Sequence, residues 1–154
     1  MSFTGEVSAT YRPADTPAEL SGEKTTSRFL ATGALTNAHF GLFQWDMAPR
    51  AGGPGAHFHK TFSESFYILD GVVRLYDGEK WVDARKGDFL YVPENGIHAF
   101  RNESDEPASM LILFAPGPPR EEYFRATAEL AATGRQLTPE ERTEFLAKHD
   151  QYMV

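Results

Sequence analysis

Three histidines and one glutamate offer the clearest chemistry in this sequence. His57 and His59 are two residues apart, and Glu64 opens the apolar run that follows them. In a β-strand this spacing places both imidazoles on one face. His98 comes later, in a segment that begins at Gly87. Three neutral imidazoles and a carboxylate suit one divalent first-row transition metal ion, such as iron, nickel, manganese, cobalt or zinc. We therefore predict His57, His59, Glu64 and His98 as metal ligands.

The composition removes several classes of site and partner. The sequence has no cysteine, which excludes disulfides, cysteine-ligated metal sites and thiol nucleophiles. Its 15 basic and 22 acidic residues give a formal net charge of −7, and such a chain repels phosphate backbones and anionic membranes. It shows neither an apolar stretch of membrane-spanning length nor a secretory signal. We therefore expect a small-molecule substrate, no nucleic acid or membrane partner, and a cytoplasmic location.

The elements that must position these ligands are predicted to be short β-strands. Between Thr25 and Pro116, segments rich in aromatic and branched aliphatic residues are broken by turn residues. Asp70-Gly71 and Asp77-Gly78 separate strand signals, and glycine accepts the positive φ of a tight hairpin turn. Many short strands with such turns predict an all-β sandwich or barrel. The expected strands are Arg28–Thr32, His39–Met47, Ser65–Leu69, Val72–Tyr76, Trp81–Ala84, Phe89–Val92, His98–Asn102 and Met110–Phe114.

The two ends of the chain differ from this β-region. The first residues are polar, with a possible short edge strand near Phe3 to Val7. After Gly117-Pro118-Pro119, a helix is expected from Glu121 to Ala132, and the capping box at Thr138–Glu141 starts a second helix that runs to about His149. We therefore divide the chain into a polar N-terminal arm (1–24), a β-barrel (25–116) and a C-terminal helical segment (117–154).

Apolar side chains near the ligands are expected to line the metal cavity, because successive strand residues alternate between faces. By this alternation Phe66, Ile68 and Phe100 share the ligands' face. Tyr123 and Phe124 on the first helix could close the barrel mouth. A dry aromatic cavity favours a flat or apolar substrate.

The two remaining histidines, His39 and His149, match no ligand pattern. We expect His39, at the start of a strand, to be packed or exposed. We expect His149, near a helix end, to be solvated, where a positive charge would interact favourably with the helix dipole.

The segment around the first two histidines resembles the first motif of the cupin superfamily. That motif is a glycine, five residues, His-x-His, three or four residues, Glu, six residues and Gly. The chain places His57, His59, Glu64 and Gly71 at those spacings. The leading glycine of the motif falls on Ala51.

The segment around the third histidine resembles the second cupin motif. That motif is Gly, five residues, Pro-x-Gly, two residues, His, three residues and Asn. The chain matches it with Gly87, Pro93, His98 and Asn102. Asn95 stands where glycine is usual, and asparagine is the next-best residue for a positive φ.

The resemblance implies a small single-domain metallocupin. Such proteins are all-β jelly-roll barrels that hold one metal ion inside and commonly form homodimers. With the two predicted C-terminal helices, the expected fold is a cupin jelly roll over residues 25–116 followed by a short helical segment. Within the family, the chain is similar to quercetinase-type dioxygenases. Glu64 would then be the catalytic residue, either as a permanent ligand or as a base that leaves the metal.

The ligand set leaves three functions open. Four protein ligands on an octahedral ion leave about two positions for substrate and dioxygen, so the leading hypothesis is a dioxygenase acting on a small aromatic or enol substrate. The same ion could polarise a carbonyl or stabilise an enolate in a redox-free cyclase or isomerase. A cupin that binds a small molecule without catalysis is the third hypothesis.

Overall fold

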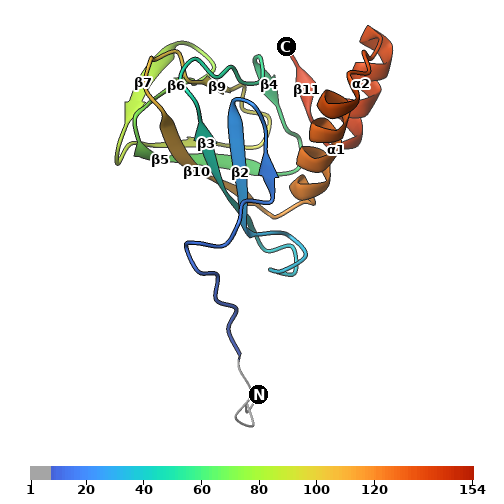
Figure 1. The fold of residues 1–154 in the computed structure, drawn as a ribbon. Coiled ribbons are helices and arrows are strands. Elements are labelled where there is room, and N and C mark those ends of the chain that lie inside the picture. Colours follow the sequence, from blue (N-terminus) through green and yellow to red (C-terminus); the bar gives the residue numbers. More distant parts are fainter. Residues whose placement is uncertain (1–7) are drawn as a thin grey trace.

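Antiparallel β-strands form the body of the molecule, and two helices lie side by side at one end of it (Figure 1). The computed structural model describes residues 8–154, so the edge strand predicted near Phe3 to Val7 lies outside the described residues. Neither helix of this described part is long and apolar enough to cross a membrane. The strands are β1 (Leu20–Ser21), β2 (Thr25–Ala31), β3 (Gly41–Met47), β4 (His57–Phe58), β5 (Ser63–Asp70), β6 (Val72–Tyr76), β7 (Trp81–Arg85), β8 (Phe89–Val92), β9 (Ala99–Arg101), β10 (Ala108–Ala115) and β11 (Tyr152–Met153). The helices are α1 (Arg120–Thr133) and α2 (Pro139–Lys148).

The strands form three sheets with a jelly-roll arrangement. A six-stranded sheet has the order β1-β2-β3-β10-β5-β8, a three-stranded sheet has the order β7-β6-β9, and β11 pairs with β4. β10 lies between β3 and β5, so a late strand joins the early strands in one sheet. Hydrogen bonds do not link the described strands into one closed ring. The predicted all-β jelly roll with two short C-terminal helices is confirmed, and the barrel consists of separate sheets that face one another.

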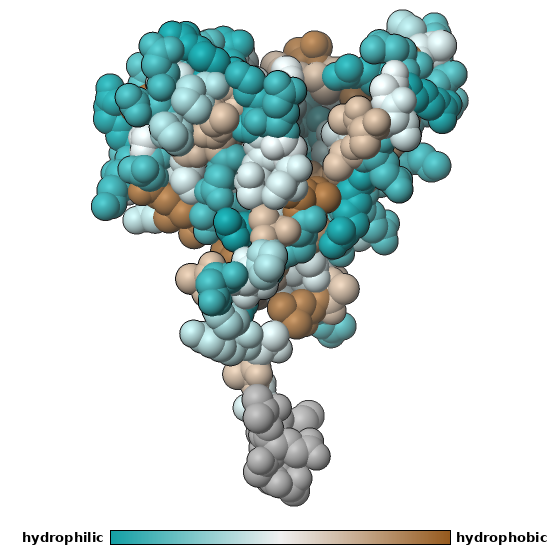
Figure 2. Space-filling view, viewed as in Figure 1, coloured by the Kyte–Doolittle hydropathy of each residue, from teal (hydrophilic) through white to brown (hydrophobic). Residues whose placement is uncertain are grey.

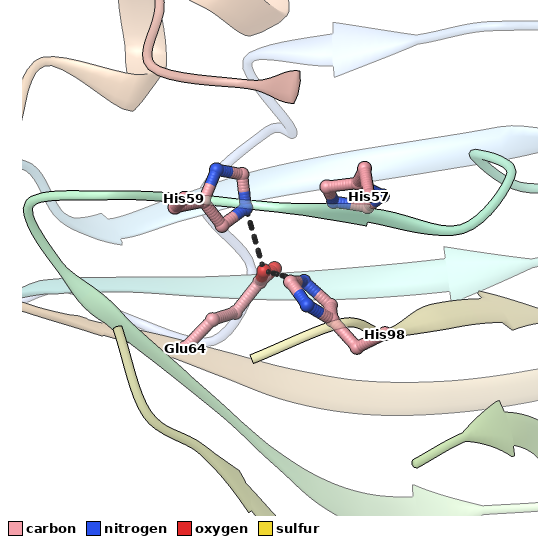
Figure 3. A group of neighbouring side chains, drawn as sticks. All are labelled: His57, His59, Glu64 and His98. Atoms are coloured by element: carbon pink, nitrogen blue, oxygen red, sulfur yellow. Dashed lines mark hydrogen bonds and ion pairs between the residues drawn. The ribbon is translucent and has the colours of Figure 1, made fainter. Parts of the chain in front are cut away.

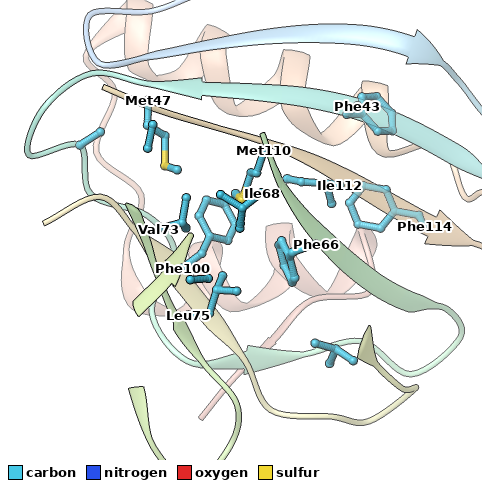
Figure 4. Packing of buried hydrophobic residues seen from close by; sticks show 14 of the residues in the cluster. Phe43, Met47, Phe66, Ile68, Val73, Leu75, Phe100, Met110, Ile112 and Phe114 are labelled. Atoms are coloured by element: carbon cyan, nitrogen blue, oxygen red, sulfur yellow. The ribbon is translucent and has the colours of Figure 1, made fainter. Parts of the chain in front are cut away.

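The core lies between the six-stranded and three-stranded sheets (Figure 4). β10 buries every second residue from Ala108 to Phe114, as expected for a strand with one face inward. Val73 and Leu75 come from the opposite sheet and are also fully buried. Apolar area removed from water on both sheets is therefore what holds the two layers together.

One of the two Asp-Gly pairs forms the predicted hairpin turn. Asp77-Gly78 lies in the turn between the paired strands β6 and β7. Asp70-Gly71 instead forms a sharp bend between β5 and β6, which belong to different sheets, so the hairpin predicted there is wrong. Gly71 has a φ of 72° and Gly78 a φ of 100°, which side chains other than glycine adopt at a cost. At Gly71 the backbone also passes close to a neighbouring segment, since an added Cβ would lie 2.3 Å from the carbonyl oxygen of Pro107. Gly71 is thus required both by its φ and by packing.

The helices begin and end close to the predicted positions. α2 starts with the predicted cap, in which the Thr138 hydroxyl accepts a hydrogen bond from the Glu141 amide at 3.1 Å. Phe124 of α1 packs its ring 5.2 Å from that of Phe43 and 4.9 Å from that of Trp45. These aromatic contacts attach α1 to the six-stranded sheet.

Two strands of two residues each, β1 and β11, were not predicted, and β4 is the short strand that the spacing of His57 and His59 assumed, although it ends at Phe58. β1 lies within the predicted polar arm and pairs with β2, while β4 and β11 pair with each other across the chain. Such short strands carry no periodic signal, because only a distant partner stabilises them. His39 lies just before β3 and is exposed, one of the two placements that the sequence allowed.

Candidate metal centre

The four predicted ligands converge inside the jelly roll (Figure 3). His57, His59, Glu64 and His98 are all buried, and one candidate ligand atom from each lies within 4.8 Å of those of the others. Ligands bound to one ion at about 2.0–2.2 Å are at most about 4.4 Å apart. The side chains therefore need to contract by only a few tenths of an ångström to share a metal ion.

Paired backbones bring these side chains together. His57 and His98 form an isolated β-bridge, in which each amide donates to the other's carbonyl oxygen at 3.0 Å. Asn95 adopts a φ of 67°, as its place in the second motif predicts, and donates its amide to the His59 carbonyl at 2.7 Å. Glu64 is fixed in β5, between β8 and β10. The site is thus built on backbone pairing between segments that lie 28 or more positions apart.

Each imidazole is held by a hydrogen bond from its outer nitrogen to a backbone carbonyl. His57 Nδ1 donates to Gly55 at 2.8 Å, and His98 Nδ1 donates to Gly96 at 3.0 Å. His59 Nδ1 donates to the carbonyl of Asp150 at 2.6 Å. Because Nδ1 is held by a carbonyl, Nε2 is the nitrogen that each ring would offer to a metal, and such partners orient metal-binding histidines.

The carboxylate of Glu64 lies against two of the imidazoles. Its Oε2 is 2.5 Å from His98 Nε2 and 3.1 Å from His59 Nε2. Burial would raise the pKa of Glu64, but the neighbouring His98 and His59 hold it well below its usual value. Burial lowers the pKa of His98, but the Glu64 carboxylate outweighs this and raises it. Glu64 is therefore ionised, as a metal ligand or a base must be.

The pKa of His57 is lowered, in contrast to that of His98. Burial lowers its pKa to about 4, and the charge of the nearby His98 adds to this effect. A histidine held neutral in this way has its nitrogen lone pair available for a metal at neutral pH.

The segment after α2 completes the site and was missed by sequence reasoning. Asp150 presents its carbonyl to His59, and its carboxylate accepts hydrogen bonds from the amides of Lys60 and Thr61, both at 2.9 Å. Asp150 has a φ of 55°, a left-handed conformation that aspartate tolerates better than most residues. No motif connects it to His59, since 91 positions separate them.

A cavity of about 510 Å³ opens from the ligands toward α1, within the usual range for small-molecule sites. The surface is hollowed between the strands and the helices in Figure 2. His57 and Glu64 reach this cavity, and most of its wall is apolar. Its aromatic residues are Trp45, Phe100, Tyr123 and Phe124.

The prediction for the cavity wall was partly correct. Phe100, Tyr123 and Phe124 line the cavity as expected, but Phe66 and Ile68 do not. Both are fully buried in the core, opposite Ile112 and Met110 of β10. Strand alternation placed them on the correct face, but only the packing decides how far each lies from the open space.

His149 differs from its prediction as a solvated residue. It is half-buried at the end of α2, with its ring 5.3 Å from that of Tyr123 and 5.2 Å from that of Phe145. Burial, with Arg120 nearby, lowers its pKa. The reason is that α1 and α2 pack together at this point and cover the imidazole.

Arg120 is the second residue that sequence reasoning missed. It is 4% exposed, lines the cavity, and carries no ion pair with any carboxylate of the described chain. Burial lowers its pKa, and the nearby Glu64 opposes this effect. Arg120 is the first residue of α1. In the sequence it lies between Gly117-Pro118-Pro119 and the expected helix, and no role was predicted for it.

Comparisons with known proteins agree with this architecture. The model of the cupin domain family matches residues 43–114, which include all four candidate ligands. Quercetin 2,3-dioxygenase of Bacillus subtilis is 32% identical over 73 residues, which are 47% of this chain and 21% of that protein. A second curated relative, from Aquifex aeolicus, is matched over 49% of its length, so the chain spans half or less of both.

Solved structures show the same fold at low sequence identity. The polyketide cyclase RemF of Streptomyces resistomycificus has a TM-score of 0.61 and 20% identity, over 73% of this chain and 82% of that one. KdgF of Halomonas has a TM-score of 0.63 and 11% identity, over 75% of this chain and 99% of that one. These structures show the cupin jelly-roll fold. The match of residues 43–114 to the cupin domain family, with the two motifs and the converged histidines and glutamate, supports the assignment to the cupin superfamily.

Proposed function

We propose that this protein is a metal-dependent dioxygenase that acts on a small aromatic or enol substrate. The observation that carries the proposal is the buried set of three histidines and Glu64 at the end of an apolar, aromatic-lined cavity. The partial similarity to quercetin 2,3-dioxygenase supports the same reaction class. A redox-active divalent ion, when bound, would lower the pKa of an enol and bring substrate and dioxygen together.

The residues of the chain would bind and orient the substrate. His57, His59 and His98 would hold the ion, with Nδ1 of each fixed by a carbonyl. Trp45 and Phe124, with ring centroids 4.9 Å apart and ring planes inclined by 55°, offer an apolar aromatic wall. Such a wall excludes water and positions an aromatic ring better than it would a free sugar.

Glu64 would hold the proton in this reaction. The neighbouring His98 and His59 keep Glu64 ionised. As a carboxylate that leaves the ligand set, it could accept a proton from a substrate hydroxyl whose own pKa the bound ion lowers. The Glu64→Gln variant should keep the fold and lose activity, because a neutral amide cannot accept that proton. Glu79 is a matched control, since it is an exposed glutamate in the turn between β6 and β7 and does not line the cavity. We expect Glu79→Gln to retain wild-type activity.

Oxygen consumption by the protein loaded with iron, nickel, manganese or cobalt tests the proposal. Flavonols and other enols are the substrates, and flavone, which lacks the enolic hydroxyl, is the negative control. We expect oxygen uptake with at least one metal and one enol, and none with flavone. No uptake with any metal over the whole panel would refute the dioxygenase.

The other two hypotheses give different results in the same preparation. A redox-free cyclase or isomerase should turn over anaerobically with zinc. A cupin that only binds a small molecule should retain its ligand unchanged after long incubation with any of the metals.

The assembly and location are part of the proposal. We propose that the protein works as a homodimer in the cytoplasm, that it binds a small-molecule substrate, and that it binds neither nucleic acid nor a membrane. Light scattering coupled to size-exclusion chromatography tests the dimer, and a mass equal to one chain would refute it.

A further inference from the structure

Arg120 is a buried cation in the wall of the metal cavity that forms no direct ion pair in the described chain. Its side chain is 4% exposed, and within residues 8–154 no carboxylate forms an ion pair with it. A charge removed from water is costly unless it is paired. Two carboxylates favour its charged form from beyond ion-pair distance. Glu64 belongs to the ligand set, and Asp150 accepts hydrogen bonds from the amides of Lys60 and Thr61.

The contacts of Arg120 use only part of its hydrogen-bonding capacity. Nη1 donates to the His149 carbonyl at 2.6 Å, and Nη2 donates to Gln151 Oε1 at 3.1 Å. Nε is buried and has no partner in the described chain. A guanidinium has five N–H donors, so these two contacts leave most of its donors unused.

Aromatic contacts hold the guanidinium in place. It lies 4.3 Å from the ring centroid of Tyr123, which also lines the cavity, and within 5.3–5.6 Å of three phenylalanine rings, namely Phe62, Phe114 and Phe124. A flexible surface arginine would lose conformational entropy on binding a ligand, but one already held in this way loses little.

The charge around the ligands also favours an anion. A divalent ion would more than neutralise Glu64, and Arg120 adds another positive charge to the same cavity. A substrate that carries a negative oxygen would balance this excess, while its apolar body would contact Trp45 and Phe124.

We propose that Arg120 is a specificity-determining residue that binds a carboxylate or enolate oxygen of an aromatic substrate. The proposal deepens the proposed function and rests on it for the identity of the cavity as a substrate site. It narrows the substrate class from aromatic or enol compounds to those that are anionic when bound.

Binding to the zinc-loaded protein tests the proposal without any turnover. The probes are two pairs of similar shape, benzoate with benzamide and 3-hydroxyflavone with flavone, and calorimetry gives their dissociation constants. The first pair tests a carboxylate and the second an enolate. Benzoate is an anion at neutral pH, and 3-hydroxyflavone becomes one if its enolic proton is lost on binding; these two are the anionic probes. We expect the anionic probe of at least one pair to bind about tenfold more tightly than its neutral partner, in line with a charge-assisted hydrogen bond in a buried site.

Variants then separate the contribution of Arg120 from that of the metal. Arg120→Met should weaken binding of the anionic probe about tenfold and leave the dissociation constant of the neutral probe unchanged. Arg120→Lys keeps the charge and should retain part of the preference. Arg125→Met is the matched control, since Arg125 lies on the same helix over the Phe29 ring but does not line the cavity. It should bind both members of each pair as the wild type does.

Nuclear magnetic resonance of the wild-type protein covers the case in which Arg120→Met does not fold. The side-chain N–H resonances of Arg120 should shift when benzoate or 3-hydroxyflavone saturates the protein, and much less with the neutral partner. A purely structural arginine, which only anchors His149 and Gln151, would not respond in this way.

The outcomes separate this proposal from the proposed function. An unchanged anion preference in Arg120→Met, or unchanged Arg120 resonances with both anions, would overturn the role of Arg120. Absence of oxygen uptake would overturn the dioxygenase but leave these binding results in place.

Discussion

The contact between Asp150 and His59 predicts that a residue outside both cupin motifs controls metal affinity. The Asp150→Ala variant keeps the backbone carbonyl that orients His59, but it loses the carboxylate that holds this carbonyl in position. That carboxylate accepts the amides of Lys60 and Thr61 at 2.9 Å and the Thr61 hydroxyl at 2.5 Å. Alanine at a φ of 55° adds a conformational cost of about 1–2 kcal/mol.

The expected loss of metal affinity is about tenfold. Removing a group that orients a metal-binding histidine typically costs about 10–100-fold in affinity. Asp150→Ala acts on that group indirectly, so the lower end of the range applies, which corresponds to about 1.4 kcal/mol. Asp150→Asn tolerates the same φ and keeps one acceptor oxygen, so it should lose less.

Competition for zinc against a chromophoric chelator measures this effect. Asp77→Ala is the matched control, because Asp77 also accepts two backbone amides, from Glu79 and Lys80 at 2.8 Å, but in an exposed hairpin turn. It should lose some stability and no metal affinity. If Asp150→Ala binds zinc within twofold of Asp77→Ala, the positioning role of Asp150 is wrong.

Three further predictions follow from the site and the turns. Changing His57, His59 and His98 together to alanine should abolish stoichiometric metal, as measured by elemental analysis of the folded protein, and a variant that retains the metal would contradict the ligand assignment. Metal affinity should decrease as the pH falls through the pKa of His98, because a protonated imidazole cannot coordinate. Burial lowers this pKa, but the Glu64 carboxylate outweighs burial and raises it above its usual value, so the loss should begin at a higher pH than for an unperturbed histidine. A calorimetric pH series measures the loss, and a flat profile would refute the prediction. Gly71→Ala should lower the free energy of unfolding by at least about 1 kcal/mol more than Gly87→Ala does, as measured by urea denaturation. Both glycines have a positive φ, but of the two only Gly71 lacks room for a Cβ. Equal losses of stability would show that φ alone sets the cost.

The sequence predicted the parts of the site that depend on local spacing. His57 and His59 occupy the same side because two positions separate them, and Gly71 and Asn95 take the positive φ that was predicted for them. The cap of α2 at Thr138 was predicted for the same reason, since a capping contact spans only three residues.

The remaining features of the fold and the site could not be predicted, because they depend on contacts between segments far apart in the sequence. Phe66 and Ile68 were placed on the correct face, but their distance from the cavity depends on how β5 packs against β10. β11 could not be predicted, because its two residues are a strand only through their pairing with β4. The predicted division at residues 24/25 and 116/117 stays a prediction, and β1 and β11 lie outside its central segment.

The sequence by itself determined which four side chains are suited to a metal and that they lie in a cupin jelly roll, because residue type and short spacing carry that information. Only the tertiary structure revealed that Asp150 orients His59 and that Arg120 lies unpaired in the cavity. Both residues follow the last strand of the jelly roll, and no local pattern marks them. Their roles arise from the folding of the C-terminal helices back over the site, which depends on packing between residues far apart in the chain.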